Sequence, residues 1–236
     1  MKLSNRALPR AVAAAAIAFA LLPGARAESP MHTDDAGTLP LGGMKIEAIW
    51  SKDDKARGGD LLFAFSPITD LELEIAAARV MDGSASPDTR LRTVGLGAKW
   101  VPFQNDTGWS LGARLDVGQT RIDDYEMASR YTERETAITG LATYRLDNGQ
   151  VLHLNLGALR LKTPDEHDTL GFWGIGYEFP LRDDLQLTLE TYGVQKSRPD
   201  QAIGLRYEVF DGFKVSGAIG RGQDRGFGLV SVAWEF

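Results

Sequence analysis

His153 and Asn155 are the residues whose types and spacing come closest to those of a catalytic site. They alternate with leucines, so in an extended strand both side chains lie on one face. A hydrolase built on such a histidine would also need a serine nucleophile within hydrogen-bond reach. Ser110, Ser216 and Ser231 have the matching strand phase, but nothing in the sequence brings one of them to His153. We therefore favour a structural, hydrogen-bonded histidine over a catalytic one.

An acidic cluster, Asp123, Asp124 and Glu126, is the second candidate. Carboxylates in this number could bind a divalent cation or bridge lipopolysaccharide. A solvated loop is the commoner role of such a cluster, and we favour it. His32 and His167 stand in polar segments without the spacing of metal ligands. The sequence thus predicts no catalytic residue, no metal and no cofactor.

Composition excludes two classes of protein. The chain has 236 residues, with 26 basic and 32 acidic side chains and a net charge of −6. A nucleic-acid-binding protein would normally carry a basic stripe, so no nucleic-acid partner is expected. Cysteine is absent, which excludes a disulfide framework and thiolate metal sites.

The N-terminus predicts export. Lys2, Arg6 and Arg10 precede an apolar run over Ala11–Leu22, and the sequence Ala-Arg-Ala ending at Ala27 fits a cleavage site. The apolar run is too short for a membrane span, which needs about 20 residues. We predict a signal peptide at 1–27, a periplasmic lead at 28–41 and one domain at 42–236.

That domain is predicted to be all β. Apolar and polar residues alternate along it with the period of two that marks a strand. About twelve strands are expected: Gly43–Ser51, Asp60–Ser66, Thr69–Arg79, Leu91–Val101, Trp109–Gly118, Glu133–Leu146, Gln150–Leu159, Thr169–Phe179, Leu185–Val194, Ala202–Phe210, Phe213–Arg221 and Arg225–Phe236. The pattern is typical of an antiparallel up-and-down barrel.

The connections alternate in length. Asp147–Gly149 and Asp211–Gly212 end short turns with a glycine at a position that favours the left-handed conformation. These turns predict three cross-strand pairs: Tyr144 with Leu152, Val209 with Phe213, and Glu208 with Lys214. The other connections, such as Gln119–Thr132, are expected to be long polar loops. Short periplasmic turns and longer extracellular loops are typical of an outer-membrane barrel.

Glycines and aromatics indicate which face meets lipid. Glycine weakens a water-facing strand, yet it recurs on the polar faces, for example at Gly174, Gly176 and Gly204. Aromatic residues of the apolar faces gather near the short turns, as in an interfacial girdle: Phe65, Trp100, Trp109, Tyr144, Phe179, Phe213, Trp234 and Phe236. We therefore expect the apolar faces to point outward, with a soluble periplasmic β-protein as the alternative.

The polar faces would then line a lumen in which both charge signs are interleaved. The candidate pore-lining residues are Glu47, Glu74, Arg114, Asp116, His153, Glu190, Arg206 and Glu208. A barrel of this size lies between packed eight-stranded barrels and open porins. Its lumen could pass a small solute or could be closed by its own ion pairs.

Several stretches resemble an outer-membrane family catalogued as "MetA-pathway of phenol degradation". They are Leu152-His-Leu-Asn-Leu-Gly157, Gly174-Ile-Gly-Tyr-Glu-Phe-Pro-Leu181, Leu187–Gly193, Gly204-Leu-Arg-Tyr207, Ala218-Ile-Gly-Arg-Gly222, Asp34-Asp-Ala-Gly-Thr38 and Leu96-Gly-Ala-Lys-Trp100. The likeness covers most of the mature chain. It implies an outer-membrane barrel that acts as a channel or transporter, and it supplies no catalytic or ligand residues.

Three functional hypotheses follow. The first is an outer-membrane channel or transporter for a small solute, with hydrophobic and aromatic molecules among the candidates. The second is a closed barrel with a structural or surface role, and the third, least favoured, is a hydrolase using His153. The expected partners are outer-membrane lipid and lipopolysaccharide, the solute, and the barrel-assembly machinery, which would bind the last strand ending at Phe236.

Overall fold

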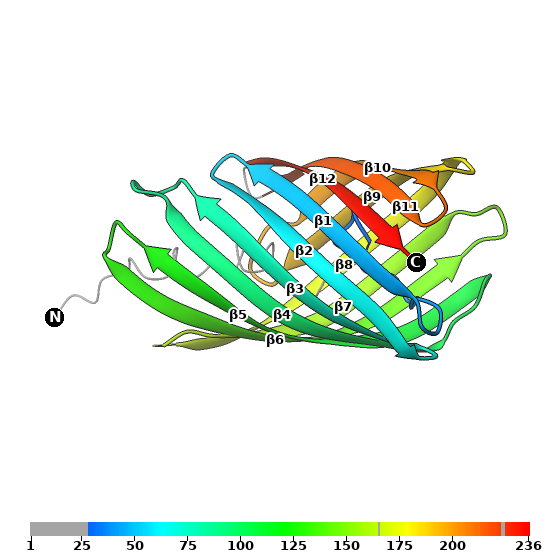
Figure 1. Ribbon diagram of the computed structural model, residues 1–236, viewed down its shortest axis with the longest axis horizontal. Coiled ribbons are helices and arrows are strands. Elements are labelled where there is room, and N and C mark those ends of the chain that lie inside the picture. The colour runs from blue at the N-terminus through cyan, green and yellow to red at the C-terminus, as the bar shows by residue number, and fades with distance from the viewer. Residues whose placement is uncertain (1–27, 165, 223–224) are drawn as a thin grey trace.

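Twelve strands form one closed antiparallel barrel in the computed structural model, which describes residues 28–164, 166–222 and 225–236 (Figure 1). The strands are β1 (Met44–Asp53), β2 (Ala56–Ile68), β3 (Leu71–Asp82), β4 (Thr89–Phe103), β5 (Gly108–Asp124), β6 (Ser129–Arg145), β7 (Val151–Lys162), β8 (His167–Arg182), β9 (Leu185–Val194), β10 (Asp200–Phe210), β11 (Phe213–Gly222) and β12 (Arg225–Glu235). The predicted fold class is confirmed. The predicted signal peptide, residues 1–27, lies outside the described residues.

The described part of the chain contains no helix long and apolar enough to be a membrane span.

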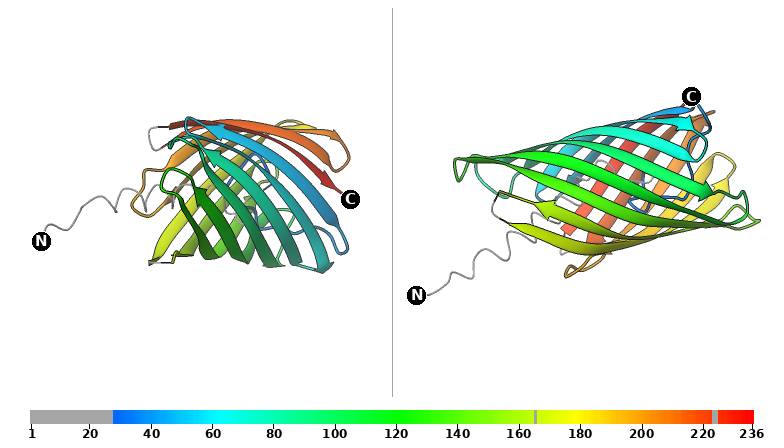
Figure 2. Two further views of the ribbon diagram at one scale, coloured as in Figure 1. Left: turned by 60° about the vertical axis from the view of Figure 1, so that its left-hand side comes forward. Right: turned by 90° about the horizontal axis from the view of Figure 1, so that it is seen from below.

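The first and last strands close the barrel (Figure 2). The backbone N–H of Met44 donates to the carbonyl of Phe236 at 2.8 Å, and the N–H of Phe236 donates to the carbonyl of Met44 at 2.9 Å. Ile46 then lies opposite Trp234, and the pairing continues along both strands. Closure of this kind satisfies the backbone groups that an open sheet would leave at its edges.

Two predicted turns have the expected geometry. Gly149 and Gly212 have φ values of +80° and +74°, in the left-handed region that glycine adopts readily. Tyr144 lies opposite Leu152, as the turn containing Gly149 predicts. Both turns therefore follow from the position of one glycine.

A bulge before the β10–β11 turn changes one predicted pair. Glu208 lies opposite Lys214, as predicted. Phe210, however, lies opposite Phe213, because the register shifts between Glu208 and Phe210 and leaves Val209 as the extra residue. The prediction that Val209 pairs with Phe213 was wrong for this reason.

The predicted long loops are mostly strand. In the stretch Gln119–Thr132, β5 continues to Asp124 and β6 begins at Ser129. β5 and β6 each have 17 residues, more than the 9 to 11 needed to span a bilayer. The additional strand residues were missed because the two faces exchange polarity there: Arg160 is exposed on the outer face while Leu159 is buried on the inner face. We call this end of the barrel the extended end, and the end with Met44 and Phe236 the terminal end.

The outer face is apolar and the inner face polar over the rest of the barrel. Val94, Leu96 and Ile138 point outward and are 58%, 56% and 60% exposed, whereas Glu47 and Arg114 point inward and are 2% and 1% exposed. A water-soluble barrel would have the reverse arrangement. The predicted inversion is therefore present.

The predicted aromatic girdle is also present near the terminal end. Phe65 and Phe213 are half-buried, and the other six members are exposed on the outer face. Trp234 packs against Phe236 with ring centroids 4.8 Å apart, and Trp109 packs against Tyr144 at 5.0 Å. Aromatic rings in such a ring fit the boundary between hydrocarbon and water.

Candidate functional site

All eight predicted lining residues lie on the inner face of the barrel. Seven are buried: Glu47, Glu74, Arg114, Asp116, His153, Glu190 and Arg206. Glu208 is half-buried and lines a cavity at the terminal end. The alternation of the strands therefore places the charged side chains inside, but it does not reveal what they contact.

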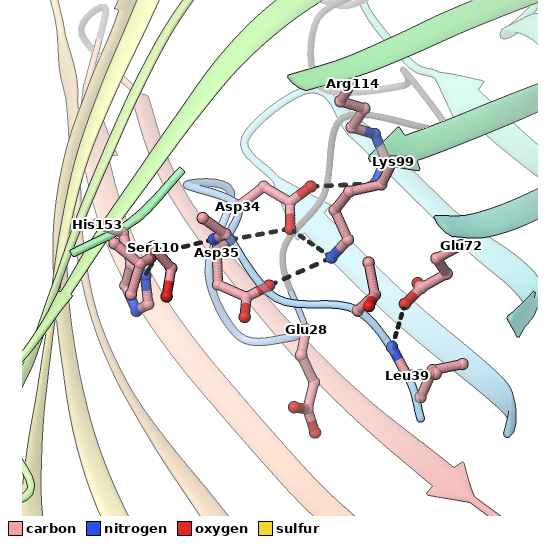
Figure 3. A network of polar contacts seen from close by, with 12 residues as sticks. Glu28, Asp34, Asp35, Leu39, Glu72, Lys99, Ser110, Arg114 and His153 are labelled. Atoms are coloured by element: carbon pink, nitrogen blue, oxygen red, sulfur yellow. Dashed lines mark hydrogen bonds and ion pairs between the residues drawn. The ribbon is translucent and has the colours of Figure 1, made fainter. Parts of the chain in front are cut away.

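Four of them, Glu47, Arg114, Glu190 and Arg206, contact the chain's own N-terminal segment. Residues 28–40, which we call the plug, lie inside the barrel, whereas we expected a lead in the periplasm. The plug starts beside Lys214 at the terminal end and passes Glu190 deeper in the lumen. It returns to the terminal end, where the N–H of Gly42 donates to the carbonyl of Ser66 at 2.8 Å. Figure 3 shows part of this path and its polar contacts.

The first arm of the plug is held by charged wall residues. Lys214 forms an ion pair of 2.8 Å with Glu28. Arg206 donates to the backbone carbonyls of Ser29 at 2.9 Å and Glu28 at 2.7 Å. The N–H of Ser29 donates to Oε1 of Glu47 at 3.0 Å. Backbone groups that would otherwise be buried without partners are satisfied in this way.

One carboxylate holds the deepest part of the plug. Oε2 of Glu190 accepts hydrogen bonds from the N–H of His32 at 2.8 Å, the N–H of Thr33 at 3.0 Å and the hydroxyl of Thr33 at 3.2 Å. The His32 ring lies 4.5 Å from the ring of Tyr192. Because two of the three donors are backbone N–H groups, the contact depends on the path of the chain more than on side-chain identity.

Asp34 is the centre of the network (Figure 3). Its carboxylate accepts from Arg114 at 3.0 Å and from Lys99 at 3.3 Å, and its side chain is 3% exposed. The side-chain amide of Asn155 accepts from the Asp34 N–H at 2.6 Å and donates to the Asp34 carbonyl at 2.8 Å. Asn155 therefore pairs with the plug backbone as a neighbouring strand would.

Arg114 connects the plug to the wall. Besides Asp34, its guanidinium contacts Glu74 at 2.9 and 2.5 Å and Asp116 at 3.0 Å. Three carboxylates thus surround one fully buried cation. Charge-assisted bonds of this kind are strong, and removing one partner leaves an uncompensated buried charge.

The returning arm is held by three hydrogen bonds from its backbone, one of them from the N–H of Thr38 to the side chain of Gln104 at 3.0 Å. The N–H of Ala36 donates to the hydroxyl of Thr143 at 2.7 Å, and the N–H of Leu39 donates to Glu72 at 2.9 Å. Ala36 and Thr143 are both fully buried. The returning arm therefore lies against β3 and β6.

Asp35 adds an ion pair on the same arm. Its carboxylate lies 3.2 Å from Lys99 and 3.6 Å from Arg145. Burial acts to raise the pKa of Asp35, but the surrounding positive charges, Lys99 foremost, and the hydrogen bond from Lys99 together outweigh it and hold the pKa below its usual range. Asp35 is therefore a carboxylate while the plug is docked at neutral pH.

His153 has structural partners. Its Nδ1 lies 3.0 Å from the hydroxyl of Thr143, and its Nε2 lies 3.6 Å from Glu178. Thr143 is fully buried and also accepts a hydrogen bond from the plug, so its hydroxyl is closed to a substrate. Ser110, one of the serines considered as a nucleophile, contacts Asn105 and Arg145 instead.

Lumen glycines make room for the plug. A Cβ on Gly174 would come within 2.8 Å of Thr33, one on Gly204 within 2.6 Å of Pro30, and one on Gly176 would overlap Met31. Real Cβ atoms essentially never come so close to another heavy atom. The glycine-rich polar faces were the sequence signal for the plug, although they indicated only a crowded lumen.

The space around the plug is unequal on its two sides. A polar cavity of about 460 Å³ opens at the terminal end, lined by the plug and by wall residues such as Lys45, Glu178 and Glu208. A second space, of about 20 Å³ and large enough for about one water, lies between Asp34 and Phe172. Toward the extended end part of the inner face is apolar, with Leu159, Leu170, Phe172 and Val194 packed together, while Glu133 and Glu135 are buried beside it.

The acidic cluster is not a solvated loop as a whole. Asp123 belongs to β5, is 4% exposed and accepts a hydrogen bond of 2.5 Å from Arg130. Asp124 ends the same strand, and Glu126 alone of the three is exposed. Within the described residues no three His, Cys, Asp or Glu side chains are grouped as metal ligands would be.

Comparison with family models shows the family of the chain. Residues 15–225 match the model described as "Uncharacterised conserved protein UCP029691". The chain belongs to this family. The predicted name, "MetA-pathway of phenol degradation", is not confirmed. A search of curated proteins found no match.

Solved structures share the fold of this family member. It is similar to the COG4313 outer membrane channel from Pseudomonas putida F1, with 11% identity, a TM-score of 0.62 and coverage of 89% of this chain and 100% of that one. The KdgM porin matches with 11% identity and a TM-score of 0.61, covering 81% and 99%. The translocator domain of the autotransporter NalP from Neisseria meningitidis matches with 12% identity and a TM-score of 0.60, covering 97% of both. These likenesses establish the outer-membrane type of barrel.

Proposed function

We propose that this protein is an outer-membrane channel in which the N-terminal plug gates the passage of a small polar solute. The observation that carries the proposal is the chemistry of the plug's attachment. Hydrogen bonds and ion pairs from Glu190, Asn155, Arg114 and Arg206 hold it. Water or a charged solute can replace such contacts, while the apolar clusters that Ala36 and Leu39 of the plug form with the wall must be exposed when the plug leaves.

The orientation follows from the termini. In outer-membrane barrels the chain ends lie in the periplasm, so we place the terminal end there and the extended end outside the cell. Both arms of the plug reach the terminal end, at Glu28 and at Gly42. The plug can therefore leave the lumen toward the periplasm without unthreading the barrel.

The cavity lining supports a polar solute. Lysines and arginines such as Lys45, Lys214 and Arg206 face acids such as Glu28 and Glu235 around the space of about 460 Å³. This lining favours a small charged or hydroxylated molecule over the hydrophobic and aromatic candidates considered from the sequence. One similar structure, with a TM-score of 0.58, is titled "KdgM porin in complex with disordered oligogalacturonate", and acidic sugars are a reasonable first set of solutes to assay.

Uptake into liposomes tests this function. Purified protein is reconstituted, and entry of a neutral sugar, an acidic sugar and benzoate is followed for the wild type and for a variant lacking residues 29–40. We expect the deletion to admit the two sugars much faster than the wild type does. Equal exclusion of all three solutes by both proteins would overturn the proposal.

A closed barrel with a structural role is the second candidate. The cluster of Arg114 with Asp34, Glu74 and Asp116 favours it, because such a network can fix one conformation. This candidate predicts a wild type that never conducts under any voltage or pH, with opening only after Arg114→Ala or Arg206→Ala. Solute uptake by the wild type would exclude it.

Catalysis has the weakest support. One structural relative, with a TM-score of 0.52, is a phospholipase A from Escherichia coli, yet His153 here contacts a hydroxyl that is fully buried. We propose that the protein is not an enzyme. Esterase activity that disappears in His153→Ala would contradict this.

A further inference from the structure

A row of arginines crosses the outer face at the extended end. Arg79 of β3 lies directly opposite Arg92 of β4, and Arg92 lies directly opposite Arg121 of β5. The three strands run side by side (Figure 1), and all three side chains are exposed. Neighbouring strands are about 4.8 Å apart, so the row is about 10 Å long.

The row lies where the apolar band of the outer face ends. Ala77 and Val94, two residues closer to the terminal end than Arg79 and Arg92, form an outward apolar pair. Val94 is 58% exposed on the outer face. In the orientation given above, the arginines therefore lie at the level of the outer leaflet's headgroups.

The protein itself neutralises little of this charge. Asp123 hydrogen-bonds to Arg130 at 2.5 Å. Its carboxylate lies 3.9 Å from Arg92 and 3.8 Å from Arg121, distances too long for hydrogen bonds. The positive charge of the three row arginines and Arg130 exceeds the negative charge of Asp123. Like charges directly opposite each other on a sheet destabilise it.

The basic surface continues onto the next two strands. Arg134 of β6 lies opposite Lys162 of β7, and both are exposed on the outer face. Arg160 of β7, two residues before Lys162, is exposed on the same face. Five consecutive strands thus present guanidinium or ammonium groups on the outer face near the extended end, although Arg134 lies opposite Gln119, two residues closer to the terminal end than Arg121.

We propose that this row binds the phosphate groups of lipopolysaccharide in the outer leaflet. Guanidinium groups bind phosphate with paired hydrogen bonds, and an anion between Arg79, Arg92 and Arg121 would remove their mutual repulsion. Acyl chains of the same lipid would lie along the apolar band next to the row. The inference rests on the orientation proposed above but not on solute transport.

A binding experiment with three ligands tests it. Purified protein in a neutral detergent is titrated with lipopolysaccharide, with its dephosphorylated form and with inorganic phosphate. The variant Arg79→Gln/Arg92→Gln/Arg121→Gln is compared with a control, Lys52→Gln/Arg182→Gln/Lys196→Gln, which removes the same charge from exposed sites outside the row. We expect lipopolysaccharide to bind the row variant at least about tenfold more weakly than the wild type, and the control to differ by less than about twofold.

Stability separates binding from a structural role. Without lipopolysaccharide, the row variant should unfold at the same temperature as the wild type or higher, because the repulsion is gone. With lipopolysaccharide, only the wild type and the control should be stabilised. Equal binding of the dephosphorylated lipid, equal loss in the control, or displacement of the lipid by inorganic phosphate at the same phosphate concentration would each overturn the proposal.

Discussion

Replacing Asp34 by alanine should release the plug. Asp34 is the plug residue that contacts both Arg114 and Lys99. Removing one member of a buried ion pair typically costs about 3 to 5 kcal/mol. Here Arg114 keeps Glu74 and Asp116, and Lys99 keeps Asp35, so we take the lower value, about 3 kcal/mol. At about 1.4 kcal/mol for each factor of ten, the undocked fraction rises about a hundredfold.

A single cysteine reports the undocked fraction. The natural chain has no cysteine, and Ala36 of the plug is fully buried against Val101 and Leu141 of the wall. In Ala36→Cys protein, a maleimide can react only when the plug leaves, and its rate follows the undocked population when docking is fast relative to labelling. We expect Asp34→Ala in this background to increase the rate about a hundredfold.

Two controls accompany this measurement. Asp106→Ala removes an exposed acid between β4 and β5 and should leave the rate unchanged. Asn148→Cys, in an exposed turn, should react quickly in every variant. An increase of less than about threefold for Asp34→Ala, at a factor of ten per 1.4 kcal/mol, would refute the assignment of Asp34 as the central contact of the plug.

Four further changes have defined outcomes. Gly176→Val should displace the plug and raise the labelling rate by about tenfold or more, whereas Gly217→Val on the outer face should not. Asp35→Asn should speed labelling at neutral pH, because the charged carboxylate of Asp35 stabilises the docked plug. This effect should fade as the pH drops below about 4. The stabilisation is complete above the pKa of Asp35 in the undocked plug and is lost as the pH falls through its lower pKa in the docked plug. Arg114→Ala should lower barrel stability by about 3 to 5 kcal/mol in urea titrations followed by heat-modifiable mobility. Deletion of Phe236 should reduce the folded fraction in outer membranes, measured on the same gels, because its pairing with β1 is lost.

Much of the barrel could be predicted because strand alternation is a local signal. The alternation of apolar and polar neighbours along each strand is enough to predict that Glu47 and Arg206 lie inside and Trp234 outside. The turn at Gly149 needs one residue with positive φ, which glycine supplies. Strand ends beyond the apolar band were missed because Leu159 and Arg160 reverse the expected polarity of the two faces.

The plug could not be derived in the same way. Its contacts join residues far apart in sequence, such as Thr33 with Glu190, and no period marks them. Gly174 and Gly176 indicated that something fills the lumen, but a glycine does not identify its neighbour. The arginine row could likewise not be predicted from the sequence, because only the strand register shows that Arg79, Arg92 and Arg121 lie side by side.

Single-channel conductance tests the central claim most directly. Wild-type protein and a variant lacking residues 29–40 are inserted into the same planar bilayer in the same salt solution. The plug that fills the lumen predicts a small or intermittent current for the wild type and a larger, steady current for the variant. Identical currents from the two proteins would contradict a gate formed by the N-terminal segment.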